Sequence, residues 1–142
     1  RIVFLDIFML KEHLEKLTKS LKVSLKEEKK KFFSFTLTEK IHLDFEDLKP
    51  GYYLYSNICE TPEEKLEDLF IYLLKANFLG NATGGNAIGI TNDEKNLTLS
   101  FHHPYEINYD LFKENVEDFV NYLVYWKMEV DEFIKKSKSN LI

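Results

Sequence analysis

The chain has 142 residues, of which 44% are hydrophobic and 15% aromatic, and its formal net charge is −5. This length suits one domain with a substantial core and leaves too little chain for two. The acidic balance excludes the clustered basic face of a nucleic-acid-binding domain. A single cysteine excludes an internal disulfide and a zinc ribbon, so we expect a reducing compartment.

The first eight residues are apolar behind a leading arginine. They are too few for a signal-peptide core with its cleavage site, and far too few to span a bilayer. Because Met9-Leu10-Lys11 resembles a native start, we predict that residues 1–8 are a leader or were added for expression. Residues 9–142 are then expected to form a single domain.

The first half of the chain predicts a helix followed by three strands. Leucines recur at intervals of four, three and four residues between Leu10 and Leu21, which is typical of an amphipathic helix. The mixed charges of residues 26–31 predict a solvated turn. Apolar and polar residues then alternate over 33–38 and 41–46, and an aromatic-rich run follows at 52–55, so we expect an antiparallel meander.

A second helix is predicted from Thr61, with Thr61 as N-cap, Pro62 in the first turn and Glu64 closing a capping box. This helix is apolar on more than one side, which indicates burial against two surfaces. It carries the apolar residues Leu66, Leu69, Phe70, Ile71, Tyr72, Leu73 and Leu74 and ends at Gly80.

The second half of the chain predicts a two-strand hairpin and a long helix. The strands are expected at 88–91 and 97–101, with a turn between them, and Asn108 is a plausible N-cap for a last helix that ends near Lys136. The apolar residues of that helix step by four and three, which is also the pattern of a coiled coil. We expect them to be core instead, because the seam is aromatic and a five-strand sheet needs a covering helix. They are Phe112, Val116, Phe119, Leu123, Trp126, Val130 and Phe133.

Four of the five glycines lie between Gly80 and Gly89, where the second helix gives way to the hairpin. Gly80 fits the end of the helix, Gly84-Gly85 permits positive φ, and Gly89 within a strand predicts that another backbone packs over it. A phosphate-binding loop is the less favoured alternative. The P-loop needs Lys and Ser/Thr after its last glycine, and the dinucleotide loop follows a strand and opens a helix, whereas here the helix comes first.

No group of residues points to a catalytic or metal site, and we predict neither an enzyme nor a cofactor. The four histidines form no ligand set, since His102 and His103 point to opposite faces of a strand. No local signature surrounds Cys59, which is expected to be a small buried thiol. The carboxylates fall on polar helix faces, so the sequence favours binding over catalysis.

The predicted order of helix, three strands, helix, two strands and helix resembles the class I chaperones of bacterial type III secretion, the Tir-chaperone family. The most specific match is the segment 73–90, which resembles the family's helix ending in Leu-Leu-x-x-Asn, its Thr-Gly-Gly loop and the strand that follows. Weaker support comes from the leucine-rich first helix and from Phe119-Val120-Asn121 and Tyr125-Trp126 near the end of the chain.

The resemblance implies an α+β fold in a small bacterial cytoplasmic homodimer that binds an N-terminal segment of one or more secreted effector proteins without ATP, with the secretion-system ATPase as a further partner. It assigns the dimer interface to the second helix and the strand after the Thr-Gly-Gly loop, with Leu69, Leu73, Phe78, Gly85, Ile88, Gly89 and Ile90. It assigns the effector-binding surface to the first helix and the meander, with Leu14, Leu17, Leu21, Phe33, Phe35, Ile41 and Leu43.

Two observations leave the assignment of that surface open. The same apolar residues of the first helix and meander can cover each other as core, whereas twelve phenylalanines and eight tyrosines exceed what a core of this size needs and indicate a binding surface. An effector is expected to bind as a helix in a groove or as a strand added to the free edge of the meander. A dimeric adaptor domain outside secretion and a small enzyme with a site at the Gly80–Gly89 loop remain alternative functions.

Overall fold

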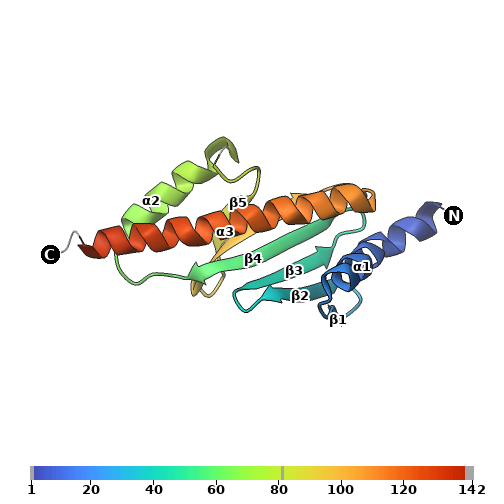
Figure 1. Cartoon of the computed structure of the whole chain (residues 1–142). Helices are drawn as coiled ribbons and strands as arrows, with labels where there is room; N and C mark the ends of the chain where they lie inside the picture. The colour runs from blue at the N-terminus through green and yellow to red at the C-terminus, as the bar shows by residue number, and fades with distance from the viewer. Residues whose placement is uncertain (1, 81, 140–142) are drawn as a thin grey trace. The chain divides into compact units, whose positions relative to one another are not determined.

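The computed structural model describes residues 2–80 and 82–139, with side chains over 10–78 and 82–138. Helices and one sheet form an α+β fold (Figure 1). In chain order they are α1 (Ile2–Leu21), β1 (Lys26–Glu28), β2 (Phe32–Thr38), β3 (Ile41–Asp47), β4 (Tyr52–Glu60), α2 (Leu66–Asn77), the 3₁₀ turn η1 (Phe78–Gly80), β5 (Ala87–Ile90), β6 (Asn96–His103) and α3 (Tyr109–Ser139). The strands are hydrogen bonded in the order β1-β2-β3-β4-β6-β5. The chain divides into two compact units, residues 1–56 with 101–117 and residues 57–100 with 118–142.

Unit 1 contains α1, the meander and the first turns of α3. The inward residues of β2, β3 and β4 are buried, as are the leucines of α1 that face them. Aromatic rings fill the centre, where Tyr52 meets Phe112 at 5.2 Å between centroids and Phe35 stacks on Phe45 at 5.8 Å. The alternation seen in the sequence therefore marks one buried face, because successive strand residues point to opposite sides.

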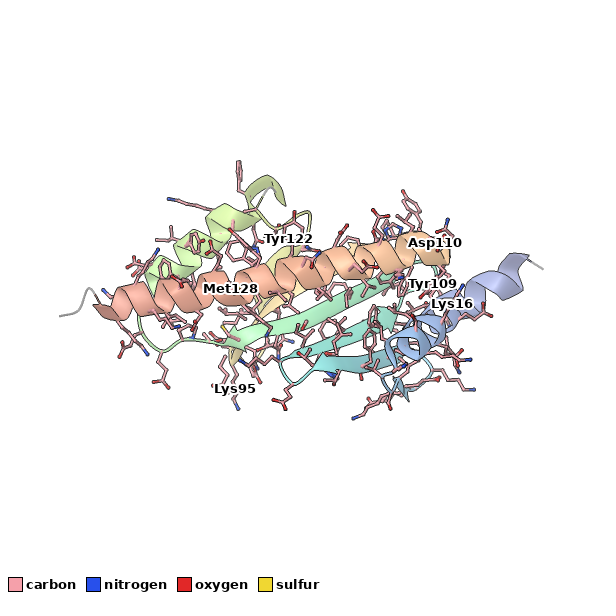
Figure 2. The ribbon with its side chains drawn as sticks, in the orientation of Figure 1. Lys16, Lys95, Tyr109, Asp110, Tyr122 and Met128 are labelled. Atoms are coloured by element: carbon pink, nitrogen blue, oxygen red, sulfur yellow. The ribbon has the colours of Figure 1, made fainter. Side chains whose placement is uncertain are left out.

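His13 joins α1 to the start of α3, which the sequence did not indicate. Its Nε2 lies 2.7 Å from the carbonyl of Ile107, and its ring lies 5.3 Å from that of Phe112. One turn further on, Lys16 Nζ sits 4.4 Å from the centre of the Tyr109 ring. Both residues are labelled in Figure 2. These contacts hold α1 against α3 within unit 1.

Unit 2 contains α2, the glycine-rich loop, β5 and the C-terminal part of α3. Figure 1 shows α2 beside that part of α3. Tyr72 of α2 stacks on Phe133 at 5.4 Å and donates a hydrogen bond from its hydroxyl to Glu129 at 3.1 Å. On α3 six of the seven predicted seam residues are core, since Phe112, Val116, Phe119, Leu123, Trp126 and Val130 are each at most 3% exposed, whereas Phe133 is half-buried.

Three sequence expectations are corrected by the structure. Residues 26–28 form the edge strand β1 where a turn was expected, so the described sheet has six strands where five were predicted. The helix α1 extends back to Ile2. The helix α2 begins at Leu66, with Lys65 in left-handed conformation before it and no side-chain cap. Thr61 lies outside this helix, where its backbone N–H donates to the Lys95 carbonyl and its Oγ1 caps nothing. In contrast, the Asn108 cap is confirmed, since Leu111 N–H donates to Asn108 Oδ1 at 2.9 Å.

Acid is expected to weaken unit 1 through His103. The Nε2 of His103 is buried with no hydrogen-bond partner, and aromatic rings of Tyr52, Phe101 and Tyr105 surround it. Burial, and then the neighbouring His102, lower the pKa of His103 below its usual 6.5. The unfolded chain therefore takes up this proton first as the pH falls, and the free energy of unfolding decreases below about pH 6.5.

The measurement is the thermal midpoint of the wild type and of His103→Phe between pH 7.5 and 5.5. We expect the thermal midpoint of the wild type to fall further than that of His103→Phe as the pH is lowered over this range. His102→Gln keeps the buried ring and removes only the second cause, so its midpoint is expected to fall nearly as much as that of the wild type. A His103→Phe variant whose midpoint falls as steeply as that of the wild type contradicts the assignment.

Candidate functional site

An apolar stripe on the exposed face of α2 is the clearest candidate for a protein interface. Leu74 is 69% exposed and Phe78, in the following 3₁₀ turn, is 71% exposed. Together with Ile71 they follow the spacing i, i+3, i+7, which places three large side chains on one face. A helix of a soluble domain normally turns such a stripe toward a partner surface.

The predicted dimer-interface residues divide between the core of unit 2 and its surface. Leu69, Leu73 and Ile88 are buried, whereas Phe78, Gly85, Gly89 and Ile90 are exposed. The sequence showed that α2 is apolar on two sides, and the structure assigns the side of Leu69 and Leu73 to the protein's own core. The exposed side belongs to Ile71 and Leu74, which the sequence prediction of the interface left out.

The glycine-rich loop packs on α3 and on its own backbone. Trp126 Nε1 donates to the Ala82 carbonyl at 3.1 Å, and Gly85 N–H donates to the Gly80 carbonyl at 3.0 Å. Gly84 has a φ of +63°, and a Cβ there would lie 2.2 Å from the ring of Tyr122. The loop is thus a structural turn fitted against α3.

Gly89 has a different environment from Gly84. A Cβ built on it would meet only Thr98 Oγ1 at 3.6 Å, an ordinary contact, and its φ is not positive. Among the described residues of this chain, no backbone therefore packs closely over Gly89 in the way that the sequence had predicted.

Asn77, the asparagine of the Leu-Leu-x-x-Asn match, joins α2 to β5. Its Nδ2 donates to the Ile88 carbonyl at 2.8 Å, and its Oδ1 accepts the Ile88 backbone N–H at 2.8 Å. The Asn77 side chain thus pairs both the N–H and the carbonyl of Ile88, which point away from β6. The role of this asparagine is to fix β5 under the end of α2.

Replacing Asn77 with alanine is expected to loosen β5 and to cost about 2 to 3 kcal/mol, because two hydrogen bonds are lost and a buried backbone donor is left unpaired. The measurement is amide hydrogen exchange at Ile88 together with the free energy of unfolding. Asn57→Ala, at an exposed strand position of the same unit, is the control. Unchanged protection at Ile88 would contradict this role.

The predicted effector-binding residues lie mostly in the core of unit 1. Leu14, Leu17, Phe33, Phe35 and Leu43 are each at most 3% exposed. Leu21 is 43% exposed and Ile41 is half-buried, so these two reach the surface. The expectation that the α1 and meander side chains are only partly used by the core is corrected for five of the seven, because α1 and the meander cover each other. The predicted free edge of the meander at β2 is also occupied, since β1 pairs with it.

The groups considered for catalysis are occupied or held neutral. Burial raises the pKa of the Cys59 thiol, which keeps it in the unreactive protonated form. His42 forms a hydrogen bond with Thr36 on the neighbouring strand, and His13 forms one with the carbonyl of Ile107.

Among the described side chains, no group of three or more His, Cys, Asp or Glu is placed to hold a metal ion. The described helices include none long and apolar enough to cross a bilayer.

Comparison with known proteins gives one family and several solved structures. The model of the Tir chaperone protein (CesT) family matches residues 12–127. Similar folds occur in a chain of the ExsC–ExsE complex (TM-score 0.71, 12% identity, 84% of this chain and 91% of that chain) and in a chain of the HopA1–SchA chaperone–effector complex (TM-score 0.65, 14% identity, 86% and 95%). A third is in the ExoU–SpcU complex from the type III secretion system of Pseudomonas aeruginosa (TM-score 0.58, 13% identity, 78% and 88%). No curated protein sequence matches the chain significantly.

Proposed function

This chain belongs to the Tir chaperone protein (CesT) family, and from that premise we propose that it is a type III secretion chaperone. It binds the N-terminal chaperone-binding segment of one or more secreted effectors and keeps that segment competent for secretion. The family match over residues 12–127 carries the proposal. The similar chains of the ExsC–ExsE, HopA1–SchA and ExoU–SpcU complexes, which share the fold, are consistent with it.

The working form of the protein is a homodimer. The exposed stripe of Ile71, Leu74 and Phe78 contributes apolar area to the interface, and Gly85, Gly89 and Ile90 lie on the exposed loop and strand that follow. Beneath this surface lie the core residues Leu69, Leu73 and Ile88.

Gly89→Val is expected to leave the fold intact and to weaken dimerisation, because no described neighbour within the chain crowds this position.

The effector segment binds on unit 1. Leu21 at the end of α1 and Ile41 at the start of β3 are the predicted contacts that reach the surface, while Leu14, Leu17, Phe33, Phe35 and Leu43 form the core beneath them. Ordering a disordered segment costs about 2 to 5 kcal/mol or more, so its binding needs extensive contact beyond these two side chains.

The chaperone acts as an equilibrium binder in the bacterial cytoplasm, without ATP, a cofactor or catalytic turnover. The glycine-rich loop of this chain lacks the lysine of a phosphate-binding loop and is filled by its own contacts with Trp126 and Gly80. Delivery of the effector then depends on a further partner, for which the secretion-system ATPase is our proposal.

Affinity purification of the chain from its native bacterium, followed by mass spectrometry, tests the function. We expect a secreted protein to be recovered in stoichiometric amount, and a fragment containing its N-terminal segment to be sufficient for binding. An adaptor outside secretion would instead recover only proteins that are not secreted. Recovery of no secreted protein under conditions that induce the secretion system would overturn the proposal.

A further inference from the structure

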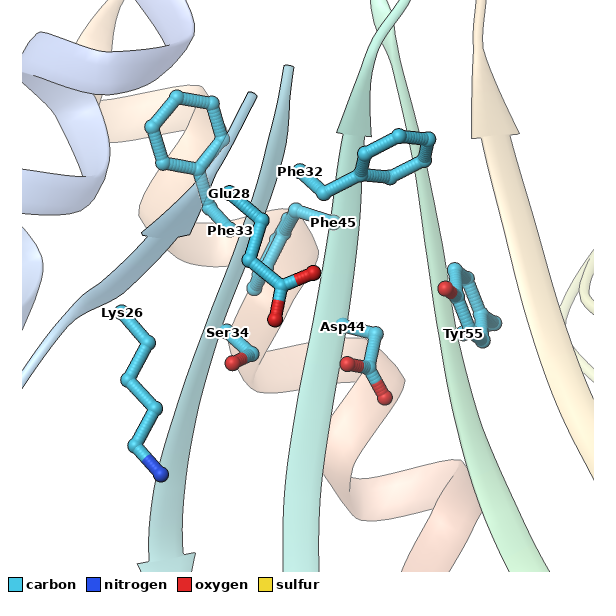
Figure 3. Close-up of a pocket in the computed structure, with 8 residues that line it drawn as sticks. All are labelled: Lys26, Glu28, Phe32, Phe33, Ser34, Asp44, Phe45 and Tyr55. Atoms are coloured by element: carbon cyan, nitrogen blue, oxygen red, sulfur yellow. The ribbon is translucent and has the colours of Figure 1, made fainter. Parts of the chain in front are cut away.

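The outer face of the meander in unit 1 has a hollow of about 280 Å³, shown in Figure 3. It is lined by Lys26, Glu28, Phe32, Phe33, Ser34, Asp44, Phe45 and Tyr55. Strand register explains the hollow, because Lys26, Ser34, Asp44 and Tyr55 stand opposite one another on β1, β2, β3 and β4. The short side chain of Ser34 leaves space between its longer neighbours.

Two carboxylates give this hollow a negative character. Figure 3 shows the carboxyl groups of Glu28 and Asp44 turned toward the space above Ser34, while the Lys26 chain extends away from it. Burial raises the pKa of Asp44 and the charge of Glu28 raises it further, while His42, whose Nε2 lies 3.4 Å from Asp44 Oδ1, lowers it and leaves the other carboxylate oxygen for a second partner. The pKa of Tyr55 is raised by burial and by the surrounding carboxylates. A cation placed between Glu28 and Asp44 would relieve the repulsion between them.

The aromatic walls suit a cation on an apolar stem. In Figure 3 the ring of Phe32 lies above Asp44 and the ring of Tyr55 lies beside it, so both offer ring surface to the stem of a cation bound next to this carboxylate. A volume of about 280 Å³ lies just below the usual range for small-molecule pockets, which suits a single side chain better than a whole ligand.

Next to the hollow, on the same face of the sheet, a lysine of the chain itself already lies between a carboxylate and an aromatic ring. Lys31 Nζ lies 3.0 Å from Glu46 Oε2 and 5.6 Å from the centre of the Phe32 ring. Glu46 and Phe32 are opposite each other on β3 and β2. The hollow repeats this combination of carboxylate and ring, with Asp44 and Tyr55 in place of Glu46 and Phe32.

We propose that the hollow over Ser34 binds one lysine or arginine side chain of the effector segment. This inference rests on the proposed function and adds to it a chemical requirement on the effector, a basic residue that is inserted between Glu28 and Asp44. Charge-assisted hydrogen bonds to the carboxylates hold the cationic head, and Phe32 and Tyr55 contact the stem. The binding is therefore weakened by salt more than contacts at the apolar surface are.

The hollow is tested first without an effector, by NMR titration of the full chain with N-acetyl-arginine N-methylamide. N-acetyl-citrulline N-methylamide has nearly the same shape without the charge and is the matched probe. We expect millimolar binding of the arginine probe, with shifts at the amides of Ser34, Asp44 and Tyr55, and at least threefold weaker binding of citrulline. Equal binding of the two probes, or shifts confined to other surfaces, overturns the proposal.

Two variants separate shape from charge in this titration. Ser34→Met fills the hollow and leaves both carboxylates, and the double variant E28Q/D44N removes the charges and leaves the shape. Both are expected to lower the affinity for the arginine probe at least fivefold with native spectra elsewhere. The control E114Q/E117Q removes two exposed charges from α3 in the same unit and is expected to bind as the wild type does. Unchanged binding by both hollow variants overturns the assignment.

Isothermal titration with the effector segment recovered by the wild-type chain completes the test. E28Q/D44N is expected to bind it about tenfold more weakly and with a smaller salt dependence, and E114Q/E117Q is expected to bind it normally. If the wild type binds the segment and E28Q/D44N binds it equally well, the hollow has no role and the chaperone function stands. If no secreted segment is recovered, the proposed function fails, and the arginine titration still decides whether the hollow takes a basic side chain.

Discussion

Leu74→Glu and Phe78→Glu are each expected to convert the dimer to a monomer of about 17 kDa at micromolar concentration. Both side chains are about 70% exposed in the single chain, so charge is tolerated there when the partner is absent. In a dimer built on this stripe, the same glutamate would be buried without a partner charge, at a cost of about 3 kcal/mol or more. That corresponds to a dimer dissociation constant raised by more than about 100-fold.

Sedimentation equilibrium measures this effect, and circular dichroism checks that the monomer stays folded. Met128→Glu is the matched control, because Met128 is 64% exposed on α3 of the same unit and lies outside the α2 stripe. Its dimer is expected to persist. If the Leu74 and Phe78 variants remain dimers while Met128→Glu dissociates, the interface lies on α3 and our assignment to α2 is wrong.

Phe35→Asp is expected to unfold unit 1. Phe35 is 1% exposed and stacks on Phe45, so the substitution removes a large buried ring and places a carboxylate in the core. Such a change costs about 4 kcal/mol or more, a large part of the 5 to 15 kcal/mol that stabilises a typical domain. The thermal midpoint and the dispersion of the amide NMR spectrum report the loss.

Leu21→Asp is the comparison that separates folding from binding. Leu21 is 43% exposed at the end of α1, and its replacement is expected to cost no more than about 1 kcal/mol while weakening effector binding. If Phe35→Asp folds normally and only loses the effector, Phe35 is a surface contact, as the sequence first suggested. If Leu21→Asp binds the effector fully, the surface lies elsewhere on unit 1.

The spacing of apolar residues predicted the helices and most strands, because each of these elements buries one face in the core. The α3 seam is an example, since its aromatic spacing indicated core and Phe112 and Trp126 are fully buried. The strand β1 was missed because Lys26, Glu27 and Glu28 are all exposed and carry no apolar alternation. The start of α2 was misplaced because Thr61 bonds to Lys95, which is distant in sequence, and the left-handed Lys65 separates the capping motif from the helix.

The candidate surfaces were harder to predict than the fold. Sequence shows that α2 is apolar on two sides, but it does not show which side meets the protein's own core. Leu73 is 5% exposed and Leu74 is 69% exposed, although they are adjacent and identical. The hollow over Ser34 depends on strand register, which sets residues of four strands in one row and leaves no local pattern in the sequence.

The Asn77 side chain also limits how this protein can aggregate. Unpaired edges of a sheet template the addition of further strands, which is the first step toward fibrils. On β5 the outward backbone groups of Ile88 are already bonded to Asn77, and on the other outer strand β1 the three residues are all charged. Strand addition is therefore blocked by a side chain at Ile88 of β5 and disfavoured at β1 by its charge and its short length. The same two features that shape the edges of the sheet thus also oppose polymerisation through it.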